Sequence, residues 1–211
     1  MNNYIIKPIS KSINIYSGYS PKYSQQREIQ ALLLLSQEQS IHFPKLIEVK
    51  KNKYIKITNQ GIDLKKLKKT NKIINVYNLD KQLATIYAIL SKTGIAHIDL
   101  NDNGKNICVS NNGIISLIDF DIVHFVNTDN NSSLTPLMKN RIQRFTYCNT
   151  FLLFYNKMIK IISLCRNIRV IQEEPKYQEN PKYQEEKEHA VHLRSSIHQS
   201  IQQVLHRNNL V

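Results

Sequence analysis

The chain has 211 residues, of which 41% are hydrophobic, and it carries a formal net charge of +13 at pH 7. This length is enough for one substantial hydrophobic core or for two small lobes that share a cleft. The three cysteines show no CxxC or Cys/His spacing, which excludes a zinc-finger or disulfide-framework protein and predicts reduced thiols. No apolar run reaches the length of a membrane-spanning helix, and Met1–Ser12 lacks the apolar segment of a signal peptide.

Much of the positive charge lies in a lysine-rich stretch, the Lys50–Lys72 cluster. Such a cluster attracts anionic partners such as a lipid surface, but it is also typical of a solvated face that keeps a protein soluble. Arginine and aromatic residues do not alternate with these lysines as they do on a base-stacking surface, so a nucleic-acid partner is not expected. The expected location is the cytoplasm, while attachment to a membrane face and delivery into another cell stay open.

Short β-prone runs predict four strands at the start of the chain: Asn3–Pro8, Ile13–Tyr16, Leu46–Val49 and Tyr54–Thr58. A helix is predicted over Tyr23–Gln37, where the apolar residues keep helical spacing, with Ser24 as its N-cap. Gly61 interrupts the pattern after the last strand, and we expect a domain boundary there. The residues before it therefore predict a small β-rich lobe.

The chain after this boundary is predominantly helical. A short helix is expected at Leu64–Leu67, and apolar residues at helical spacing predict a longer helix over Leu79–Lys92, which Gly94 ends. Ile95–Phe125 contains two polar loops between short apolar strands. Arg141–Ile171 has the apolar content of one or two helices.

The last part of the chain is polar at first and amphipathic afterwards. A near repeat, Pro175–Glu179 and Pro181–Glu185, contains prolines that are typical of a linker. The residues after this repeat predict a final helix. The predicted organisation is a small lobe, a helical lobe, a linker and a C-terminal helix, at residues 1–61, 62–172, 173–188 and 189–211.

The most informative pattern is the run from His97 to Asp121. It places Asp99, Asn106 and Asp119 on two loops that a short apolar hairpin joins. Phosphoryl transfer needs such a set of groups, because one carboxylate orients the attacking hydroxyl and two further oxygen ligands hold magnesium.

The order of these motifs resembles the protein-kinase-like superfamily. The motifs are His97-Ile98-Asp99-Leu100, Asn106-Ile107-Cys108-Val109 and Leu117-Ile118-Asp119-Phe120. The resemblance implies an α+β, compact two-lobed protein-kinase-like fold, with a small β-rich N-lobe that lacks the glycine-rich loop and a reduced helical C-lobe. It also implies ATP and Mg²⁺ as cofactors, with Asp99 as the base and Asn106 and Asp119 as magnesium ligands.

The resemblance extends upstream to the groups that position ATP. Arg27–Leu32 resembles the helix whose glutamate, here Glu28, pairs with a lysine on a strand. Tyr54–Gly61 resembles the last strand and the hinge of the small lobe. This likeness implies that Asn59 and Gly61 contact the adenine of ATP.

The position of the strand lysine has two alternatives. Tyr4–Lys7 is similar to the lysine-bearing strand of kinases and supplies Lys7. If Ser12–Tyr16 is that strand instead, Asn14 takes the place of the lysine. Both alternatives stay open at the level of the sequence.

The loop after Asp99 departs from the usual spacing. Asn106 follows Asp99 by seven positions, whereas the kinase pattern H-R-D-x-x-x-x-N has five, so Asp102-Asn103-Gly104 is expected to bulge. Asn103 is the magnesium ligand in an alternative register, although Ile107-Cys108-Val109 favours Asn106.

Asp99-Leu100-Asn101 and Leu117–Asp121 most resemble lipopolysaccharide (Kdo-type) kinases and the small-molecule kinases of the aminoglycoside and choline kinase group. This resemblance implies an enzyme that moves a phosphoryl group from ATP to a hydroxyl group of a small molecule, a glycolipid or a protein. Because no glycine-rich phosphate loop is found, a catalytically weak or inactive pseudokinase that acts as a binding module is the alternative.

Overall fold

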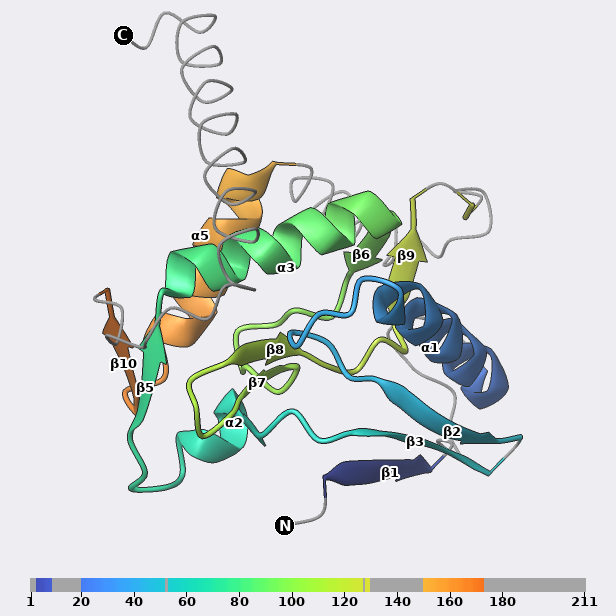
Figure 1. Cartoon of the computed structure of the whole chain (residues 1–211), viewed down its shortest axis with the longest axis horizontal. Helices are drawn as coiled ribbons and strands as arrows, with labels where there is room; N and C mark the ends of the chain where they lie inside the picture. The colour runs from blue at the N-terminus through green and yellow to red at the C-terminus, as the bar shows by residue number, and fades with distance from the viewer. Residues whose placement is uncertain (1–2, 9–19, 52, 127, 130–149, 173–211) are drawn as a thin grey trace, which may run out of the picture. The chain divides into compact units, whose positions relative to one another are not determined.

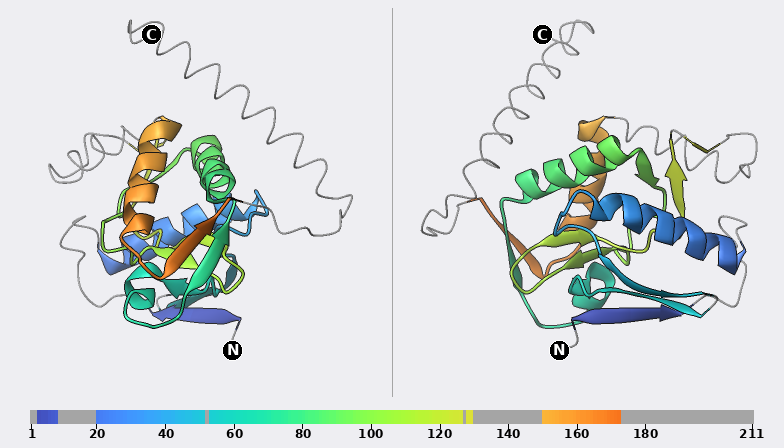
Figure 2. Two further views of the ribbon diagram at one scale, coloured as in Figure 1. Left: turned by 90° about the vertical axis from the view of Figure 1, so that its left-hand side faces the viewer. Right: turned by 45° about the vertical axis from the view of Figure 1, so that its right-hand side comes forward.

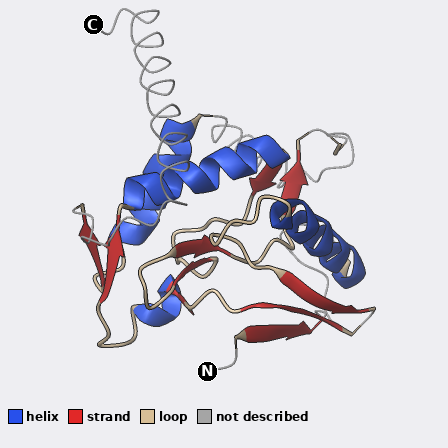
Figure 3. Cartoon of the chain, viewed as in Figure 1, coloured by secondary structure: helices blue, strands red, loops and turns tan. Residues whose placement is uncertain are grey.

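The structure is a computed structural model that describes residues 3–8, 20–51, 53–126, 128–129 and 150–172. The chain divides into two compact units, Met1–Glu173 and Glu174–Val211, and all the described residues belong to the first. Helices and strands are mixed along this unit (Figure 3), so the α+β prediction is confirmed. The strand predicted at 13–16, the linker and the C-terminal helix lie outside the described residues, and the division into two lobes at residue 61 stays a prediction.

An antiparallel sheet contains the first strands of the chain. Its strands, in spatial order, are β1 (Tyr4–Pro8), β3 (Tyr54–Thr58) and β2 (Leu46–Lys50). Ile55 and Ile57 of β3 are buried, which identifies the inner face of the sheet. Residues that pair directly across antiparallel strands lie on the same face, and Lys7 pairs with Ile55. The register of β1 therefore directs Lys7 towards the interior.

Helix α1 (Pro21–Ser36) contacts both this sheet and the later strand β9 (Val123–Phe125) (Figure 1). The prediction of Ser24 as its N-cap is wrong, because Ser20 caps the helix and its Oγ accepts a hydrogen bond from the backbone N–H of Tyr23 at 3.2 Å. Pro21 explains the earlier start, since proline lacks an N–H and suits the first turn of a helix.

A tight connection leads from β3 to the rest of the unit. Gly61 has a φ of +105°, and a Cβ at this position would lie 2.3 Å from the carbonyl oxygen of Val109. The next elements are β4 (Ile62–Asp63) and the predicted short helix α2 (Leu64–Leu67), which is confirmed. Strand β4 pairs with β7 (Ile107–Val109), which pairs with β8 (Ile115–Leu117).

The long helix that the sequence predicts is confirmed as α3 (Leu79–Thr93), and Gly94 ends it in the left-handed conformation. The chain continues directly into β6 (Ile95–His97), which pairs antiparallel with β9. Helix α5 (Phe151–Ser163) packs alongside α3 (Figure 2). Tyr87 of α3 joins the two helices, because its ring centroid lies 5.6 Å from those of both Phe151 and Phe154.

The prediction of only helices through Ile171 is wrong at its end, where the chain forms strand β10 (Ile168–Ile171). This strand pairs in parallel with β5 (Ile74–Tyr77), a strand that local patterns did not predict (Figure 1). The side chain of Asn167 positions β10, because its Nδ2 donates to the carbonyl oxygens of Thr70 at 2.8 Å and Lys72 at 3.1 Å. Three β-branched residues in four also favour a strand over a helix.

One hydrophobic core runs through the described part of the unit. Its largest fully buried side chains are Phe120, Leu32, Leu35, Ile55, Leu64, Leu67, Leu83, Ile86, Ile98, Ile107, Ile115 and Leu117. They come from strands β3, β7 and β8, from helices α1 to α3 and from the loops after β6 and β8. Packing on both sides of the two polar loops therefore fixes where those loops lie.

The lysines of the Lys50–Lys72 cluster lie on different elements of the fold. Lys50, Lys51 and Lys53 lie at the β2–β3 turn, whereas Lys65 and Lys66 lie in α2, at the other end of the β3–β4 stretch (Figure 1). Among the described residues, no helix combines the length and the apolar character that a membrane crossing requires.

Candidate active site

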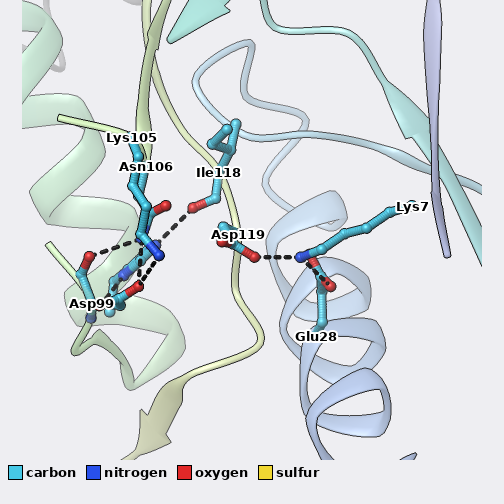
Figure 4. Close-up of polar contacts among 8 residues, drawn as sticks. Lys7, Glu28, Asp99, Lys105, Asn106, Ile118 and Asp119 are labelled. Carbon is cyan, nitrogen blue, oxygen red and sulfur yellow. Dashed lines mark hydrogen bonds and ion pairs between the residues drawn. The ribbon is translucent and has the colours of Figure 1, made fainter. Parts of the chain in front are cut away.

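Lys7 of β1 joins α1 to the loop after β8. Its Nζ donates to both carboxylate oxygens of Glu28, at 2.9 and 2.8 Å, and also forms an ion pair with Asp119 (Figure 4). Glu28 is buried, and the sheet register points Lys7 at it. Of the two candidates for the strand lysine, the structure thus places Lys7 beside Glu28, and Asn14 lies outside the described residues.

The charges around Lys7 favour its protonated form. Burial would lower the pKa of Lys7, but the charges of Glu28, Asp119 and Asp121 and the hydrogen bond to Asp119 outweigh burial and raise it. Burial also acts to raise the pKa of Asp119, whereas Lys7 and Lys105 lower it, and the net pKa lies below the ordinary value. Lys7 and Asp119 therefore face each other as an ammonium and a carboxylate.

Asp119 has an unusual backbone conformation for a residue other than glycine. Its φ is +67°, in the left-handed region that aspartate and asparagine tolerate better than other residues. The next residue, Phe120, is completely buried, with its ring centroid 4.9 Å from that of His97. The buried ring holds the turn in place, and the turn presents the carboxylate of Asp119 to Lys7.

Asp99 and Asn106 form the second group of the site. The Nδ2 of Asn106 donates to Asp99 twice, to its carbonyl oxygen at 2.8 Å and to its carboxylate Oδ2 at 2.9 Å. Both side chains are buried. Asn103, the alternative ligand, is exposed, and its Oδ1 accepts a hydrogen bond from the backbone N–H of Lys105 instead.

The backbone of Ile118 holds the two groups together. Its N–H donates to the carbonyl oxygen of Asn106 at 3.0 Å, and its carbonyl oxygen accepts from His97 Nε2 at 2.8 Å. With Nε2 protonated, His97 Nδ1 accepts the backbone N–H of Asp99 at 3.4 Å. Burial lowers the pKa of His97, which favours this neutral tautomer. Asp119 consequently lies between the Lys7 group and the Asp99 group (Figure 4).

Asn59 and Gly61, the residues predicted to contact adenine, lie in the connection between β3 and β4. Asn59 Oδ1 accepts a hydrogen bond from the backbone N–H of Gly61 at 3.0 Å. The close approach of Gly61 to Val109 fixes this connection against β7. An adenine contact from these two residues stays a prediction.

The sequence did not point to Lys105 as a member of the site. Its Nζ lies 3.0 Å from Asp99 Oδ2. The position of Lys105 next to Asn106 in the sequence was only a weak signal. The direction of the Lys105 side chain depends on the course of the bulge, which the sequence does not give.

Arg27 was likewise overlooked as a support for α1. Its Nε and Nη2 donate to the carbonyl oxygen of Val123 at 3.1 and 2.7 Å, and its guanidinium also forms an ion pair with Asp129. The guanidinium carbon lies 4.8 Å from the ring centroid of Phe125. No local pattern in the sequence indicates these contacts, because about a hundred residues separate the partners.

The donor set suits magnesium bound together with phosphate. Asn106 uses its Nδ2 for Asp99, so its Oδ1 is the atom that can face a cation, and Asp119 supplies carboxylate oxygen. The described residues contain no group of three or more His, Cys, Asp or Glu side chains that could hold a metal alone. Magnesium commonly binds through one or two protein oxygens and the phosphates of a substrate.

Asp121 adds to the negative charge near Asp119. Burial and the charge of Asp119 raise the pKa of Asp121 to about 7. Two neighbouring carboxylates that resist joint ionisation favour a bound cation. Asn106 and Asp119 therefore fit the magnesium ion that the sequence resemblance implies.

Comparison with known proteins identifies the family. The RIO domain model matches residues 10–147, which is more than half of the chain and includes Glu28, Asp99, Asn106 and Asp119. No curated protein matches the chain. Among solved structures, the chain is similar to WbdD in its co-crystal structure with the kinase inhibitor LY294002, with 16% identity and a TM-score of 0.45.

That similarity covers 77% of this chain and 42% of WbdD, so the chain spans less than half the length of that structure. The expectation of a protein-kinase-like protein is confirmed at the level of the family by the RIO match, since RIO is a protein-kinase-like family. The chain belongs to the RIO domain family.

Proposed function

We propose that this protein is an ATP-dependent phosphotransferase that moves the γ-phosphoryl group of ATP to a hydroxyl acceptor. The observation that carries the proposal is the position of Lys7, which contacts Glu28 and Asp119 together. A lysine held by a helix glutamate next to a metal-binding aspartate is the arrangement that positions ATP phosphates in kinases. The buried Asp99–Asn106 pair across from it supplies a carboxylate for the acceptor.

Each residue has a separate role in this proposal. Lys7 binds the phosphates, and Glu28 keeps the ammonium in place. Asp99 orients the acceptor hydroxyl and accepts its proton as the bond to phosphorus forms. Asn106 and Asp119 hold Mg²⁺, which neutralises charge on the phosphates when it is bound.

The test begins with nucleotide binding. Mg-ATP at about ten times its Kd should raise the melting temperature of the wild-type protein by about 3 °C. Asp119→Asn should abolish most of this shift, because it removes a magnesium ligand and the partner of Lys7. Asparagine is the appropriate replacement, since it tolerates the positive φ at this position whereas alanine would add backbone strain.

The second step measures phosphoryl transfer from radiolabelled ATP, to water and to candidate acceptors. Asp99→Asn should bind Mg-ATP and yet transfer phosphate at least about a hundredfold more slowly. Asp80→Asn serves as a matched control, because Asp80 is an exposed carboxylate on α3 that accepts a hydrogen bond from the Tyr155 hydroxyl at 2.7 Å. Transfer that is unaffected by both Asp99→Asn and Asp119→Asn would overturn the proposal.

A second candidate is a pseudokinase that binds nucleotide or a protein partner without catalysis. Strand β1 is the edge of its sheet in the described part of the chain, so no described strand beyond it bears a phosphate-covering loop. Mg-ATP binding without transfer to any acceptor would favour this candidate.

The acceptor belongs to the proposal as well. The likeness of the two loops to lipopolysaccharide kinases and to aminoglycoside or choline kinases predicts a sugar, a lipid-linked sugar or a small alcohol, and a protein acceptor is the alternative. Labelled ATP incubated with a panel of these four acceptor classes would separate them. Binding to anionic vesicles would test a role for the Lys50–Lys72 cluster, and such binding should weaken steeply with salt.

A further inference from the structure

The extra residues between Asp99 and Asn106 form an ordered turn. Gly104 donates its N–H to the carbonyl oxygen of Asn101 at 3.2 Å, and it adopts a φ of +73°. A Cβ on Gly104 would lie 2.9 Å from the Cβ of Leu64, so the turn packs closely against α2. The turn thus has one defined course between Asp99 and Asn106.

Helix α5 holds the outer side of this turn. Asp102 forms ion pairs with Lys157 at 2.6 Å and with Lys160 at 2.9 Å. The hydrogen bonds from the two lysines lower the pKa of Asp102 to about 2, so its carboxylate stays charged. Contacts with α2 and α5 together fix the direction in which the chain leaves the turn.

Lys105 is the residue that leaves the turn towards the site. Its Nζ lies 3.0 Å from Asp99 Oδ2, the same oxygen that accepts the Asn106 amide at 2.9 Å. The carboxylates of Asp119 and Asp121 add further negative charge around this ammonium. The ammonium is therefore retained in the site, while 43% of the side chain remains exposed.

We propose that Lys105 is a catalytic residue whose ammonium binds the γ-phosphate of ATP during transfer. The inference rests on the proposed function and deepens it. Phosphoryl transfer spreads negative charge over the non-bridging oxygens of the γ-phosphate, and a fixed cation beside the acceptor carboxylate stabilises that charge. Among the described residues, Lys7 contacts the carboxylates of Glu28 and Asp119, whereas Lys105 contacts that of Asp99 and has the exposure needed to meet a ligand.

The chemistry of the step balances without a further reactant. The bond between the γ-phosphorus and the oxygen that bridges to the β-phosphate breaks, and a bond from the acceptor oxygen to the γ-phosphorus forms. The hydroxyl proton moves to Asp99, and ADP leaves. Lys105 contacts a non-bridging oxygen throughout and keeps its proton.

If the role of Lys105 were only structural, its ammonium would pair with Asp99 and contact no nucleotide. A comparison of ATP with ADP distinguishes this structural role from a contact with the γ-phosphate. Calorimetric titration would compare Mg-ATP with Mg-ADP for the wild type, Lys105→Met, Lys105→Arg and Lys92→Met. Lys92 of α3 is the matched control, because its ammonium forms a surface ion pair with Glu38 at 2.8 Å. Melting curves of all four proteins report whether each variant is folded.

Lys105→Met should weaken Mg-ATP binding by about tenfold and leave Mg-ADP binding within about twofold, because only ATP carries the γ-phosphate. It should also slow ATP hydrolysis by about a hundredfold, since the contact strengthens as charge develops. Lys105→Arg should retain part of the Mg-ATP affinity and part of the hydrolysis rate. Lys92→Met should match the wild type in both measurements.

Two results would overturn the inference, and they differ from a failure of the proposed function. Equal weakening of both nucleotides by Lys105→Met would indicate a structural role for Lys105. Unchanged binding and hydrolysis in that variant would show that Lys105 contacts no phosphate. Failure of the wild type to bind either nucleotide would overturn the proposed function, and the role of Lys105 with it.

Discussion

Arg27 and Glu28 are consecutive residues of α1, and their side chains hold the helix to two different segments. Glu28 accepts hydrogen bonds from Lys7 of β1, whereas Arg27 donates to Val123 of β9 and pairs with Asp129. Successive side chains on a helix point about 100° apart, so one helix contacts both segments at once. The orientation of Glu28 towards Lys7 therefore depends on the contacts of Arg27.

Arg27→Met should destabilise the protein by about 2 kcal/mol, because it removes two hydrogen bonds from the buried guanidinium to the Val123 carbonyl oxygen and the ion pair with the half-buried Asp129. It should also weaken Mg-ATP binding, since α1 no longer holds Glu28 against Lys7. Urea unfolding would measure the first effect and calorimetry the second. Arg27→Lys keeps a charge but not the forked donor geometry, so its loss should be smaller. Equal stability of Arg27→Met and the wild type would contradict this role.

Gly61→Ala should cost more stability than the same change at Gly94. Both glycines have positive φ, which costs an alanine about 1 kcal/mol. At Gly61 the new methyl group would also meet the carbonyl oxygen of Val109 at 2.3 Å, so β4 and β7 would have to move apart. Urea unfolding of the two variants should show a loss at Gly61 at least about 1 kcal/mol greater. Similar losses would mean that the β3–β4 connection yields without strain.

His42 should make the protein less stable in mild acid. Its buried ring donates from Nδ1 to the carbonyl oxygen of Ile115 at 2.7 Å. Burial lowers the pKa of His42 below its ordinary value, and the hydrogen bond offsets this only in part. The unfolded chain then takes up the proton more readily. The stability that His42 contributes is complete above about pH 6.5 and is lost as the pH falls through the folded-state pKa.

The measurement for His42 is the urea midpoint between about pH 7 and pH 5, where an unperturbed histidine titrates. The wild-type midpoint should fall more steeply than that of His42→Asn, which keeps an N–H donor but does not titrate. Parallel slopes for the two proteins would assign the acid sensitivity to other groups.

Phe120→Ala should destabilise the protein by about 3 to 5 kcal/mol. Phe120 is completely buried, and its ring lies 6.0 Å from Phe43 and 4.9 Å from His97 between centroids. Leu152→Ala is the control, because Leu152 is 55% exposed on α5 and should lose less than about 1 kcal/mol. Thermal and urea unfolding would measure the stability of both variants. If Phe120→Ala lost no more stability than Leu152→Ala, the turn at Asp119 would not depend on the buried ring of Phe120.

Periodicity predicted the elements that have enough residues to show it. Helix α3 presents Leu79, Leu83 and Ile86 on one buried face, and this spacing is visible in the sequence. Strands β5 and β10 contain four residues each and are set by their pairing with each other, which no local window contains. Segments of that length are ambiguous until the partner strand is known.

The candidate site divides in the same way. The order of the motifs was sufficient to predict that Asp99, Asn106 and Asp119 belong to one site, and the structure places them on adjoining loops. The choice of Lys7 over Asn14 needed the register of β1 on β3, which depends on contacts across the sheet. A prediction of Lys105 as a site residue would have needed the course of the turn before it, which α2 and α5 fix from outside the loop.

The parallel pairing of β5 with β10 has a practical consequence for where the protein can be cut. The RIO match ends at residue 147, but Ile74 and Val76 of β5 are 2% and 0% exposed in a structure that includes β10. A fragment trimmed to the family match would lose α5 and β10 and leave an unpaired, apolar strand edge, which promotes aggregation. A fragment that continues through Ile171 keeps that edge paired, so strand pairing and not the family boundary determines the shortest expressible piece.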